Sequence, residues 1–207
     1  MIRPLVRLFR SIYYGVTRFV FERAVLNVYL NKGEASLSVM SGLEIVDVSN
    51  KEKYLLVSCI GDYLTQNKFE SRIQRGDACF AAFFNDKPVH FSWVSFDKAV
   101  IREVRKSYHL SQEQAYIYHC FTHPEFRGRD IYPIVLARIV KGLQLKGKKH
   151  FFISTAANNL ASQKGILKAG FHQVESIIFL RILGFKFYNN KLIGENYGQY
   201  LIERKNP

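Results

Sequence analysis

One stretch of the sequence, residues 116–132, carries residue types that could bind a phosphorylated ligand. An aromatic and β-branched run leads into a short basic loop with Arg127, Gly128 and Arg129, and an apolar helical pattern follows. A loop that opens a helix points backbone N–H groups at the helix N-terminus, where the helix dipole favours an anion. The two arginines add positive charge, and the glycine lets the backbone approach a ligand closely. The pattern indicates a pyrophosphate site; its alternative is an ordinary strand-to-helix loop with solvated arginines.

A second segment, about thirty residues later, also opens a helix. Together the two segments resemble the cofactor-binding motifs of the GNAT superfamily of acyl-CoA N-acyltransferases. The pyrophosphate loop of that family usually reads Pro-x-x-Arg-Gly-x-Gly-x-Gly. Its second motif usually reads Asn, then Ala or Ser three residues later, then Lys-x-Gly-Phe. The matching residues here are Pro124, Arg127 and Gly128 in the first motif and Asn159, Ser162, Lys168, Gly170 and Phe171 in the second.

The resemblance covers roughly residues 50–180 and implies a fold, a co-substrate and a reaction. The implied fold is α/β (α+β), a GNAT-like mixed and mostly antiparallel central sheet with flanking helices. The implied reaction is direct transfer of an acetyl or longer acyl group from acetyl-CoA (acyl-CoA) to a small-molecule amine, with an amino sugar of a cell-envelope pathway as our first hypothesis. The residues that the resemblance places at the cofactor are Cys120, Phe121, Thr122, Arg127, Gly128, Arg129, Asp130, Ile131, Tyr132, Asn159 and Ser162.

Three positions depart from the family pattern. Asp130 and Tyr132 stand where the family has its second and third loop glycines. A carboxylate facing a pyrophosphate would be repelled, so we expect Asp130 to point away and cap the following helix. Ile166 stands where many members carry a tyrosine proposed to protonate the departing thiolate, so that usual general acid is missing.

The strand 115–122 is the one that, by resemblance, would be splayed from its neighbour and would expose backbone amides to the thioester arm. Strand alternation predicts two faces for it. Either His119 or Tyr118 could face the acceptor as a catalytic residue, and histidine has a suitable unperturbed pKa for a base. The alternative is a structural histidine. The predicted faces are Tyr116, Tyr118, Cys120 and Thr122 on one side and Ile117, His119 and Phe121 on the other.

Cysteine and histidine spacing argues against other chemistries. Cys120 lacks an arranged Cys, His and Asp pattern, so we expect it in the core or lining the cofactor. The histidines are scattered, no HExxH pattern occurs, and the three cysteines form no CxxC pair. We therefore predict no metal and no disulfide framework.

Turn residues and periodicity predict the elements that position these residues. Residues 85–88 are typical turn residues between two β-branched and aromatic runs, which predicts a hairpin. Asp130 and Gly147 bound a helical pattern. The predicted strands are 43–48, 78–84, 89–96, 115–122, 151–155, 171–183 and 197–203. The predicted helices are a stretch of about twenty residues that ends near Gly76, then 131–146 and 159–168. A polar connection is predicted at 97–113 and a turn at 188–191.

The pattern of apolar and basic residues in 1–30 predicts a separate amphipathic basic helix. At about 100° per residue the apolar side chains gather on one side and the arginines on the other. We divide the chain into this N-terminal helical element, 1–32, and a GNAT-like acyltransferase domain, 33–207. The apolar face could lie on an anionic membrane or pack on the domain. The apolar side consists of Leu5, Phe9, Ile12, Val16 and Phe19, and the basic side of Arg3, Arg7, Arg10 and Arg18.

Composition bounds the compartment and the partners. The longest uncharged apolar stretches fall short of the roughly 20 residues that span a bilayer, so we expect a cytoplasmic protein with no spanning segment. A peripheral contact at the inner face of the membrane is one of the two alternatives for residues 1–30. The net charge of +13 attracts phosphate-bearing ligands, anionic lipid or nucleic acid. No nucleic-acid motif occurs, so nucleic acid is not an expected partner. A nonenzymatic GNAT-like module that binds nucleic acid or a protein is the alternative function, and the oligomeric state stays open.

Overall fold

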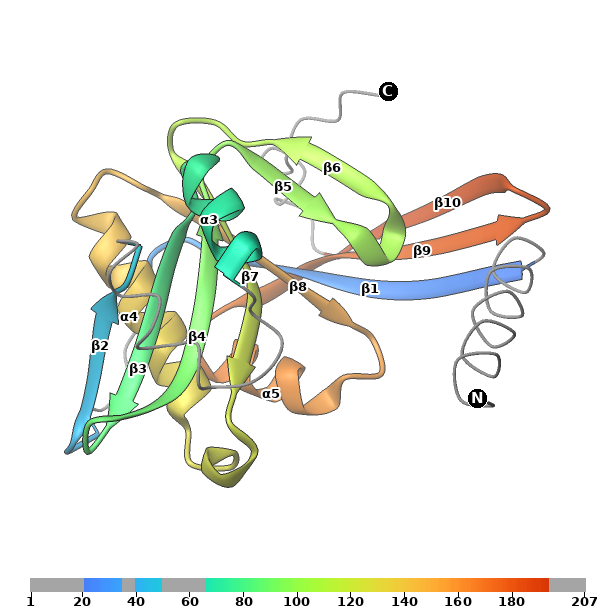
Figure 1. Ribbon diagram of the computed structural model, residues 1–207. Helices are drawn as coiled ribbons and strands as arrows, with labels where there is room; N and C mark the ends of the chain where they lie inside the picture. The colour runs from blue at the N-terminus through green and yellow to red at the C-terminus, as the bar shows by residue number, and fades with distance from the viewer. Residues whose placement is uncertain (1–20, 35–39, 50–65, 194–207) are drawn as a thin grey trace, which may run out of the picture.

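A mixed sheet forms the centre of the molecule in the computed structural model, which describes residues 21–34, 40–49 and 66–193. Within these ranges eight strands follow the order β10-β9-β1-β8-β7-β4-β3-β2, and every neighbouring pair is antiparallel except β7 with β8 (Figure 1). The predicted mixed, mostly antiparallel sheet is therefore confirmed. The strands of this sheet are β1 (Phe21–Asn31), β2 (Leu43–Asp47), β3 (Ala78–Phe84), β4 (Lys87–Ser95), β7 (Gln114–Thr122), β8 (His150–Ala156), β9 (His172–Ile182) and β10 (Phe185–Leu192).

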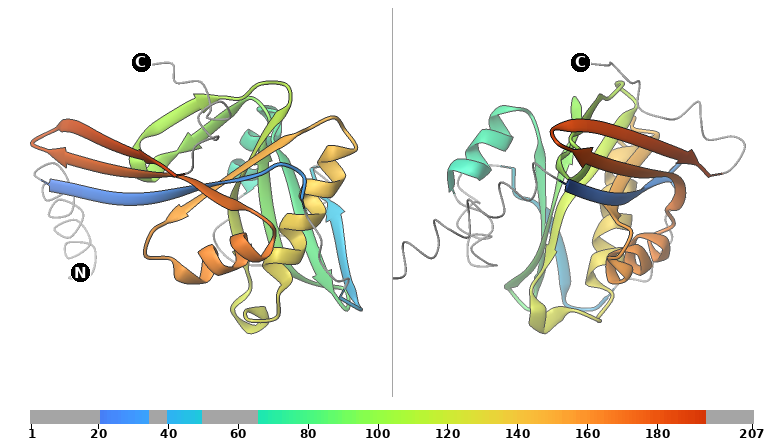
Figure 2. Two further views of the ribbon diagram at one scale, coloured as in Figure 1. Left: turned by 180° about the vertical axis from the view of Figure 1, so that it is seen from behind. Right: turned by 90° about the vertical axis from the view of Figure 1, so that its right-hand side faces the viewer.

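Helices and a small second sheet cover the two faces of the central sheet (Figure 2). One core cluster joins the sheet to α4 and α5, and two others join its opposite face to α3 and to the β5–β6 pair. A sheet with both faces covered buries apolar side chains on each side. This explains why its strands are rich in aromatic and aliphatic residues. The covering elements are α3 (Gln66–Gln74), β5 (Lys98–Ile101), η2 (Arg102–Val104), β6 (Lys106–His109), η3 (Pro124–Phe126), α4 (Ile131–Gln144) and α5 (Leu160–Lys168).

The β3–β4 hairpin was predicted from its turn residues and is present. Asn85 and Asp86 both have positive φ, 48° and 63°, which a two-residue hairpin turn of type I′ requires. The turn is shorter than the predicted 85–88, because Lys87 and Pro88 already belong to β4. Gly147, with φ of 85°, follows α4 as predicted.

The predicted N-terminal helix is wrong from residue 21 onward. Residues 21–31 form β1, which lies between β8 and β9 inside the sheet, so a boundary at residue 32 would cut the domain. A central strand buried on both faces is apolar along most of its length and lacks the alternation that marks a half-buried strand. The predicted helix over residues 1–20 lies outside the described residues.

Four other predictions need correction or fall wholly or partly outside the described residues. The polar connection 97–113 contains β5, η2 and β6. The turn predicted at 188–191 is part of β10, and the chain reverses instead at Leu183 and Gly184, which both have positive φ. Helix α3 ends near the expected place, but the earlier part of that predicted helix and the predicted strand 197–203 lie outside the described ranges. None of the described helices is both long and apolar enough to cross a bilayer.

Candidate active site

The parallel strands β7 and β8 separate in the middle of the sheet. Their pairing covers only Gln114–Ile117 with His150–Ile153, whereas β7 continues to Thr122 and β8 to Ala156. Within the described residues, the second half of β7 pairs with β4 on one side only, and Figure 1 shows β8 turning away toward α5. A strand edge with unpaired backbone groups can bind an extended ligand through main-chain hydrogen bonds. The strand splaying that the resemblance implied is thus present.

Two residues of the loop between β7 and α4 have the left-handed backbone conformation that glycine favours. Gly128 has φ of 76° and Asp130 has φ of 57°, both in the left-handed region, which aspartate tolerates better than most residues. A Cβ added at Gly128 would meet nothing within 4 Å, so the space in front of this glycine is open. Arg127 and Arg129 on either side are exposed, whereas the Ile131 side chain is buried in the core. The backbone amides at the start of α4, not the Ile131 side chain, are therefore available to an anion.

The side chains at the two helix starts make contacts that the sequence did not predict. Asp130 makes no capping hydrogen bond; its Oδ2 instead lies 2.7 Å from Nζ of Lys168 in α5. The predicted cap at Asp130 is wrong because the left-handed backbone turns the side chain toward α5. Asn159 is the residue that caps, since its Oδ1 accepts a hydrogen bond from the Ser162 N–H at 3.1 Å. This capping role accounts for Asn159 without a cofactor.

Both arginines of the loop lie beside aromatic rings near the end of β7. The Arg127 Nε donates to the Thr122 carbonyl at 3.1 Å, and its guanidinium lies 5.8 Å from the Phe121 ring centre. The Arg129 guanidinium lies 5.3 Å from the Phe126 ring centre. These contacts hold two positive charges next to the amides of the loop.

Tyr132 spans the distance between α4 and α5. Its ring packs on Gly165, where an added Cβ would lie only 2.6 Å from Cδ1 of the tyrosine, and its hydroxyl lies 3.4 Å from Oγ of Ser162. Burial raises the pKa of Tyr132, so the side chain is a neutral phenol at physiological pH. The phenol also contacts Cys120 on β7. Tyr132 is therefore a hydroxyl donor held beside the open half of β7.

A row of buried polar side chains continues from Tyr132 into the sheet. Burial raises the pKa of the Cys120 thiol to about 11, against the smaller lowering effect of the neighbouring Ser92 and Tyr132 side chains. Ser92 Oγ lies 2.8 Å from Nε2 of His90, whose Nδ1 lies 2.8 Å from Oγ1 of Thr122. Burial lowers the pKa of His90 to about 3, so this imidazole is neutral. The high thiol pKa supports the prediction that Cys120 is not a nucleophile.

A β-bulge at His119 changes the predicted faces of β7. His119 has φ of 48°, and the pairing of β7 with β4 shifts between Phe91 and Trp93. The bulge adds one residue, so the strict alternation assumed from the sequence is wrong after residue 118. Cys120 packs in the cluster with α4, on the side opposite α3. The residues that share the α3 side are Tyr118, His119 and Phe121.

His119 is a neutral imidazole bound to a cation. Its Nδ1 lies 2.7 Å from Nη1 of Arg72 on α3. A guanidinium can only donate, so Nδ1 accepts and the ring proton is assigned to Nε2. Burial, and then the charge of Arg72, lower the pKa of His119 to about 4. His119 could accept a proton at neutral pH, but only as a weak base.

Tyr118 belongs to a second cluster at the end of α3. Its hydroxyl donates to Oδ2 of Asp77 at 2.6 Å, and the same oxygen lies 2.7 Å from Nη2 of Arg75. The Arg72 guanidinium lies 4.9 Å from the Trp93 ring centre and 5.2 Å from that of Tyr118. Burial, followed by the hydrogen bond to Asp77, raises the pKa of Tyr118, so its hydroxyl acts as a donor and not as a base.

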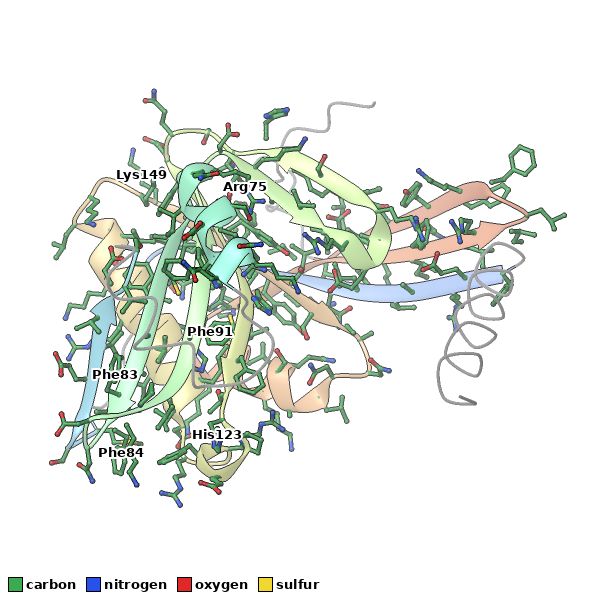
Figure 3. All side chains as sticks on the ribbon, in the orientation of Figure 1. Arg75, Phe83, Phe84, Phe91, His123 and Lys149 are labelled. Atoms are coloured by element: carbon green, nitrogen blue, oxygen red, sulfur yellow. The ribbon has the colours of Figure 1, made fainter. Side chains whose placement is uncertain are left out.

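The sequence contained no signal for the partners from α3. Arg72, Arg75 and Asp77 lie about forty residues before β7, in no motif, and only the packing of α3 on the sheet brings them to Tyr118 and His119. Figure 3 shows Arg75 beside α3 and His123 in the loop that follows β7, with Phe91 between them. The α3 cluster and the basic loop therefore flank the second half of β7.

A cavity of about 480 Å³ lies elsewhere in the fold. It is bounded by the C-terminal end of α4, whereas the basic loop precedes the N-terminus of that helix. Its only link to the residues above is Asp77. The lining residues are Asp47, Ser49, Ile73, Gly76, Asp77, Ala78, Phe80, Phe96, Leu143, Lys146 and Lys148. Nowhere in ranges 21–34, 40–49 and 66–193 do three or more His, Cys, Asp or Glu side chains form a group that could hold a metal ion.

Comparison with solved structures shows the GNAT acyl-CoA N-acyltransferase fold. A GNAT-family acetyltransferase from Colwellia psychrerythraea matches with a TM-score of 0.54 and 17% identity, over 82% of this chain and 57% of that one. A putative GNAT-family acetyltransferase from Novosphingobium aromaticivorans matches with a TM-score of 0.53 and 11% identity, over 77% and 63%. A Drosophila protein matches with a TM-score of 0.55 and 10% identity, over 86% and 57%.

This chain matches less than two thirds of the length of each of these three structures. No protein-family model matches the sequence. A comparison with curated proteins finds no match either.

Proposed function

We propose that this protein is an acyl-CoA-dependent N-acyltransferase that moves an acetyl or longer acyl group to an amine. One observation carries the proposal: β7 leaves β8 after Ile117, at the strand that feeds the basic loop and the N-terminus of α4. An open strand edge next to an anion-binding helix start suits a ligand that combines amide groups with a pyrophosphate. The GNAT fold supports the same assignment.

The residues present suit acyl-CoA at two places. The amides from Gly128 to Tyr132, with Arg127 and Arg129, would hold the pyrophosphate, and the space open in front of Gly128 would admit it. The edge of β7 that faces β8, beyond Ile117, would bind the amides of the pantetheine arm. When bound, acyl-CoA supplies an activated thioester carbonyl. The protein then has to orient the amine, accept its proton and stabilise the departing thiolate.

His119 and Tyr118 are our candidates on the acceptor side. Both lie on the α3 face of β7, beside the open strand edge. Neutral His119 could take the proton of the amine, directly or through water, at Nδ1 once that nitrogen exchanges its hydrogen bond from Arg72. The Tyr118 oxygen, whose proton is donated to Asp77, could accept a hydrogen bond from the acceptor. Tyr132, on the other face, could donate to the thiolate, because its phenol is neutral and touches Cys120 on the open half of β7. Ile166, buried in the core, cannot supply that proton.

An amino sugar of a cell-envelope pathway is the acceptor that we propose, on the resemblance in layout to acetyltransferases of surface-polysaccharide pathways. We place the reaction in the cytoplasm, where acyl-CoA is made, with a peripheral contact at the inner face of the membrane. A panel of amino sugars, polyamines and peptide amines, assayed by release of free thiol from acetyl-CoA, tests the acceptor. Turnover with a peptide amine but with no amino sugar would exclude the acceptor and leave the reaction class intact.

A nonenzymatic binding module is the second candidate, and two observations favour it. Tyr132 fills space between α4 and α5, and Asp130 places a carboxylate in the loop where the family has glycine. A protein that had lost coenzyme binding could keep the scaffold for a protein or nucleic-acid partner. Binding of nucleic acid that weakens steeply with salt, together with absence of acetyl-CoA binding, would favour this function.

Calorimetric titration with acetyl-CoA decides between the two candidates. We expect micromolar binding that weakens at least about tenfold in the double variant Arg127→Ala/Arg129→Ala, because two charge-assisted contacts to phosphate are lost. The matched control is Lys146→Ala/Lys148→Ala, at the opposite end of α4, which removes the same charge without touching the loop. Equal loss in both variants would indicate a general charge effect and contradict the assignment of the loop.

A further inference from the structure

The sheet extends away from the rest of the molecule at one end, where β1, β9 and β10 continue as three strands (Figure 1). Paired positions on these strands form rows across one face, because residues two apart on a strand point to the same side. The rows, from the tip inward, are Phe21 with Ile182 and Phe185, Arg23 with Leu180 and Phe187, and Val25 with Ile178 and Asn189. We call these nine residues the apolar tip.

The apolar tip is unusually exposed for its composition. Phe185 is 73% exposed, Phe21 56% and Phe187 54%, and Leu183 in the turn beside them is also exposed. Seven of its nine residues are apolar, the exceptions being Arg23 and Asn189. Contiguous exposed apolar side chains of this size mark an interaction surface more often than isolated exposed residues do.

The opposite face of the same three strands is partly covered. Phe179 is fully buried, and its ring packs 5.3 Å from that of Tyr188. Lys106 of β6 lies 4.3 Å from the Tyr188 ring centre, and Arg105 pairs with Glu22. The β5–β6 side of the molecule therefore supplies the packing on that face, and the apolar tip is the face left exposed.

The charges on and near the apolar tip indicate which kind of partner binds it. The three rows and the next one, Asn27 with Ser176 and Lys191, contain two cations, Arg23 and Lys191, and no acid. In the sequence, residues 1–20 directly precede Phe21 and contain four arginines and no acid. A second copy of this chain would bring like charges together, whereas an anionic bilayer offers apolar depth and negative headgroups.

We propose that the apolar tip binds the surface of an anionic lipid bilayer, with the phenyl rings of Phe21, Phe185 and Phe187 below the headgroups and Arg23 at the phosphates. This surface is distinct from the contact through residues 1–30 that composition alone suggested, because β9 and β10 supply most of it. It places the domain that carries the proposed acyltransferase site against a membrane. Binding combines buried apolar area with attraction to anionic headgroups, so it weakens with salt.

Co-sedimentation of the full chain with phosphatidylcholine vesicles, with and without phosphatidylglycerol, tests the proposal. We expect binding only to the anionic vesicles and a loss of about tenfold or more in the partition coefficient for Phe185→Ser/Phe187→Ser. The matched control is Leu145→Ser/Leu160→Ser, which changes two apolar residues on the helical side of the molecule that are even more exposed, 87% and 65%. A Phe185→Trp variant should show fluorescence quenching by brominated anionic lipid.

Three results would overturn the proposal. The first is absence of binding to anionic vesicles at low salt. The second is unchanged binding of Phe185→Ser/Phe187→Ser, which would leave residues 1–20 as the membrane contact. The third is a dimer in light scattering that this double variant converts to monomer without any vesicle binding, which would make the tip an interface between copies. Acetyl-CoA titration of the same variants measures coenzyme binding, on which the proposed function depends, separately from membrane binding.

Discussion

The carboxylate of Asp130 lies 2.7 Å from the ammonium of Lys168, and this contact joins the loop before α4 to the last turn of α5. The sequence places an aspartate where an anion-binding loop should have glycine. The structure shows that its charge is matched by Lys168, which lies in the second of the two segments that resemble GNAT motifs. Since both side chains are about half exposed, the pair should matter more for the local potential than for folding stability.

Lys168→Ala should weaken acetyl-CoA binding several-fold, because it leaves the Asp130 charge unpaired beside the proposed pyrophosphate site. The double variant Lys168→Ala/Asp130→Asn should bind at least as well as the wild type. Calorimetric titration at low ionic strength measures both, and the difference should shrink as salt is added. Equal affinity of the wild type and Lys168→Ala at low salt would show that the carboxylate does not face the ligand.

Asn159→Ala should lower the free energy of unfolding by roughly 0.5–2 kcal/mol, because it removes the capping bond to the Ser162 N–H. Asn159→Asp, which can still cap, should restore most of that stability. Urea denaturation measures the three proteins. If Asn159→Ala weakens acetyl-CoA binding and Asn159→Asp does not, Asn159 acts on binding by stabilising the start of α5. Weaker binding in both variants would indicate that the Asn159 side chain contacts the ligand directly.

Gly165→Ala should destabilise the protein by about 1–3 kcal/mol, since the new Cβ would lie 2.6 Å from Cδ1 of Tyr132. In a Tyr132→Ala background the same change should instead stabilise α5 by up to about 1 kcal/mol, because alanine favours a helix over glycine. Thermal unfolding of the four proteins gives the coupling. An additive cycle would mean that the ring of Tyr132 does not pack on α5.

Acidification should destabilise the protein through His119. The pKa of His119 is lowered to about 4 in the fold, so between about pH 6.5 and that value the unfolded chain binds a proton that the folded chain does not. Stability from this group is thus present above about pH 6.5 and lost as the pH falls toward 4. His119→Asn, chosen because asparagine tolerates positive φ, should lose less stability than the wild type between pH 7 and pH 5 in urea denaturation.

Buried His90 contributes in the same direction, because its pKa is lowered to about 3. Its effect remains in the His119→Asn variant, so that variant should keep part of the pH dependence of the wild type. A pH dependence equal to that of the wild type would show that His119 is solvated and titrates normally, and would weaken its assignment as a base of unusually low pKa.

Local patterns in the sequence determined most elements of the sheet and two helix starts. The Asn85 and Asp86 turn, the stop at Gly147 and the helix after Asn159 depend on residues close together in the chain, so turn and capping preferences suffice to predict them. The helix after Asp130 was predicted from its apolar periodicity, although Asp130 does not cap it. The same holds for the basic loop at Arg127–Arg129, whose position between a strand and a helix is visible in the sequence. The GNAT-like arrangement followed from the order of these elements together with the two motifs.

Only the tertiary structure decided which residues meet. Strand β1 was mistaken for helix, since a central strand takes its stability from neighbours far away in sequence and shows no pattern of its own. The bulge at His119 reversed the predicted faces of β7, because the register depends on the pairing with β4. Arg72 and Asp77 reach His119 and Tyr118 through the packing of α3 on the sheet, and the apolar tip appears when β9 and β10 pair beside β1. These are long-range contacts, and local sequence preferences do not encode them.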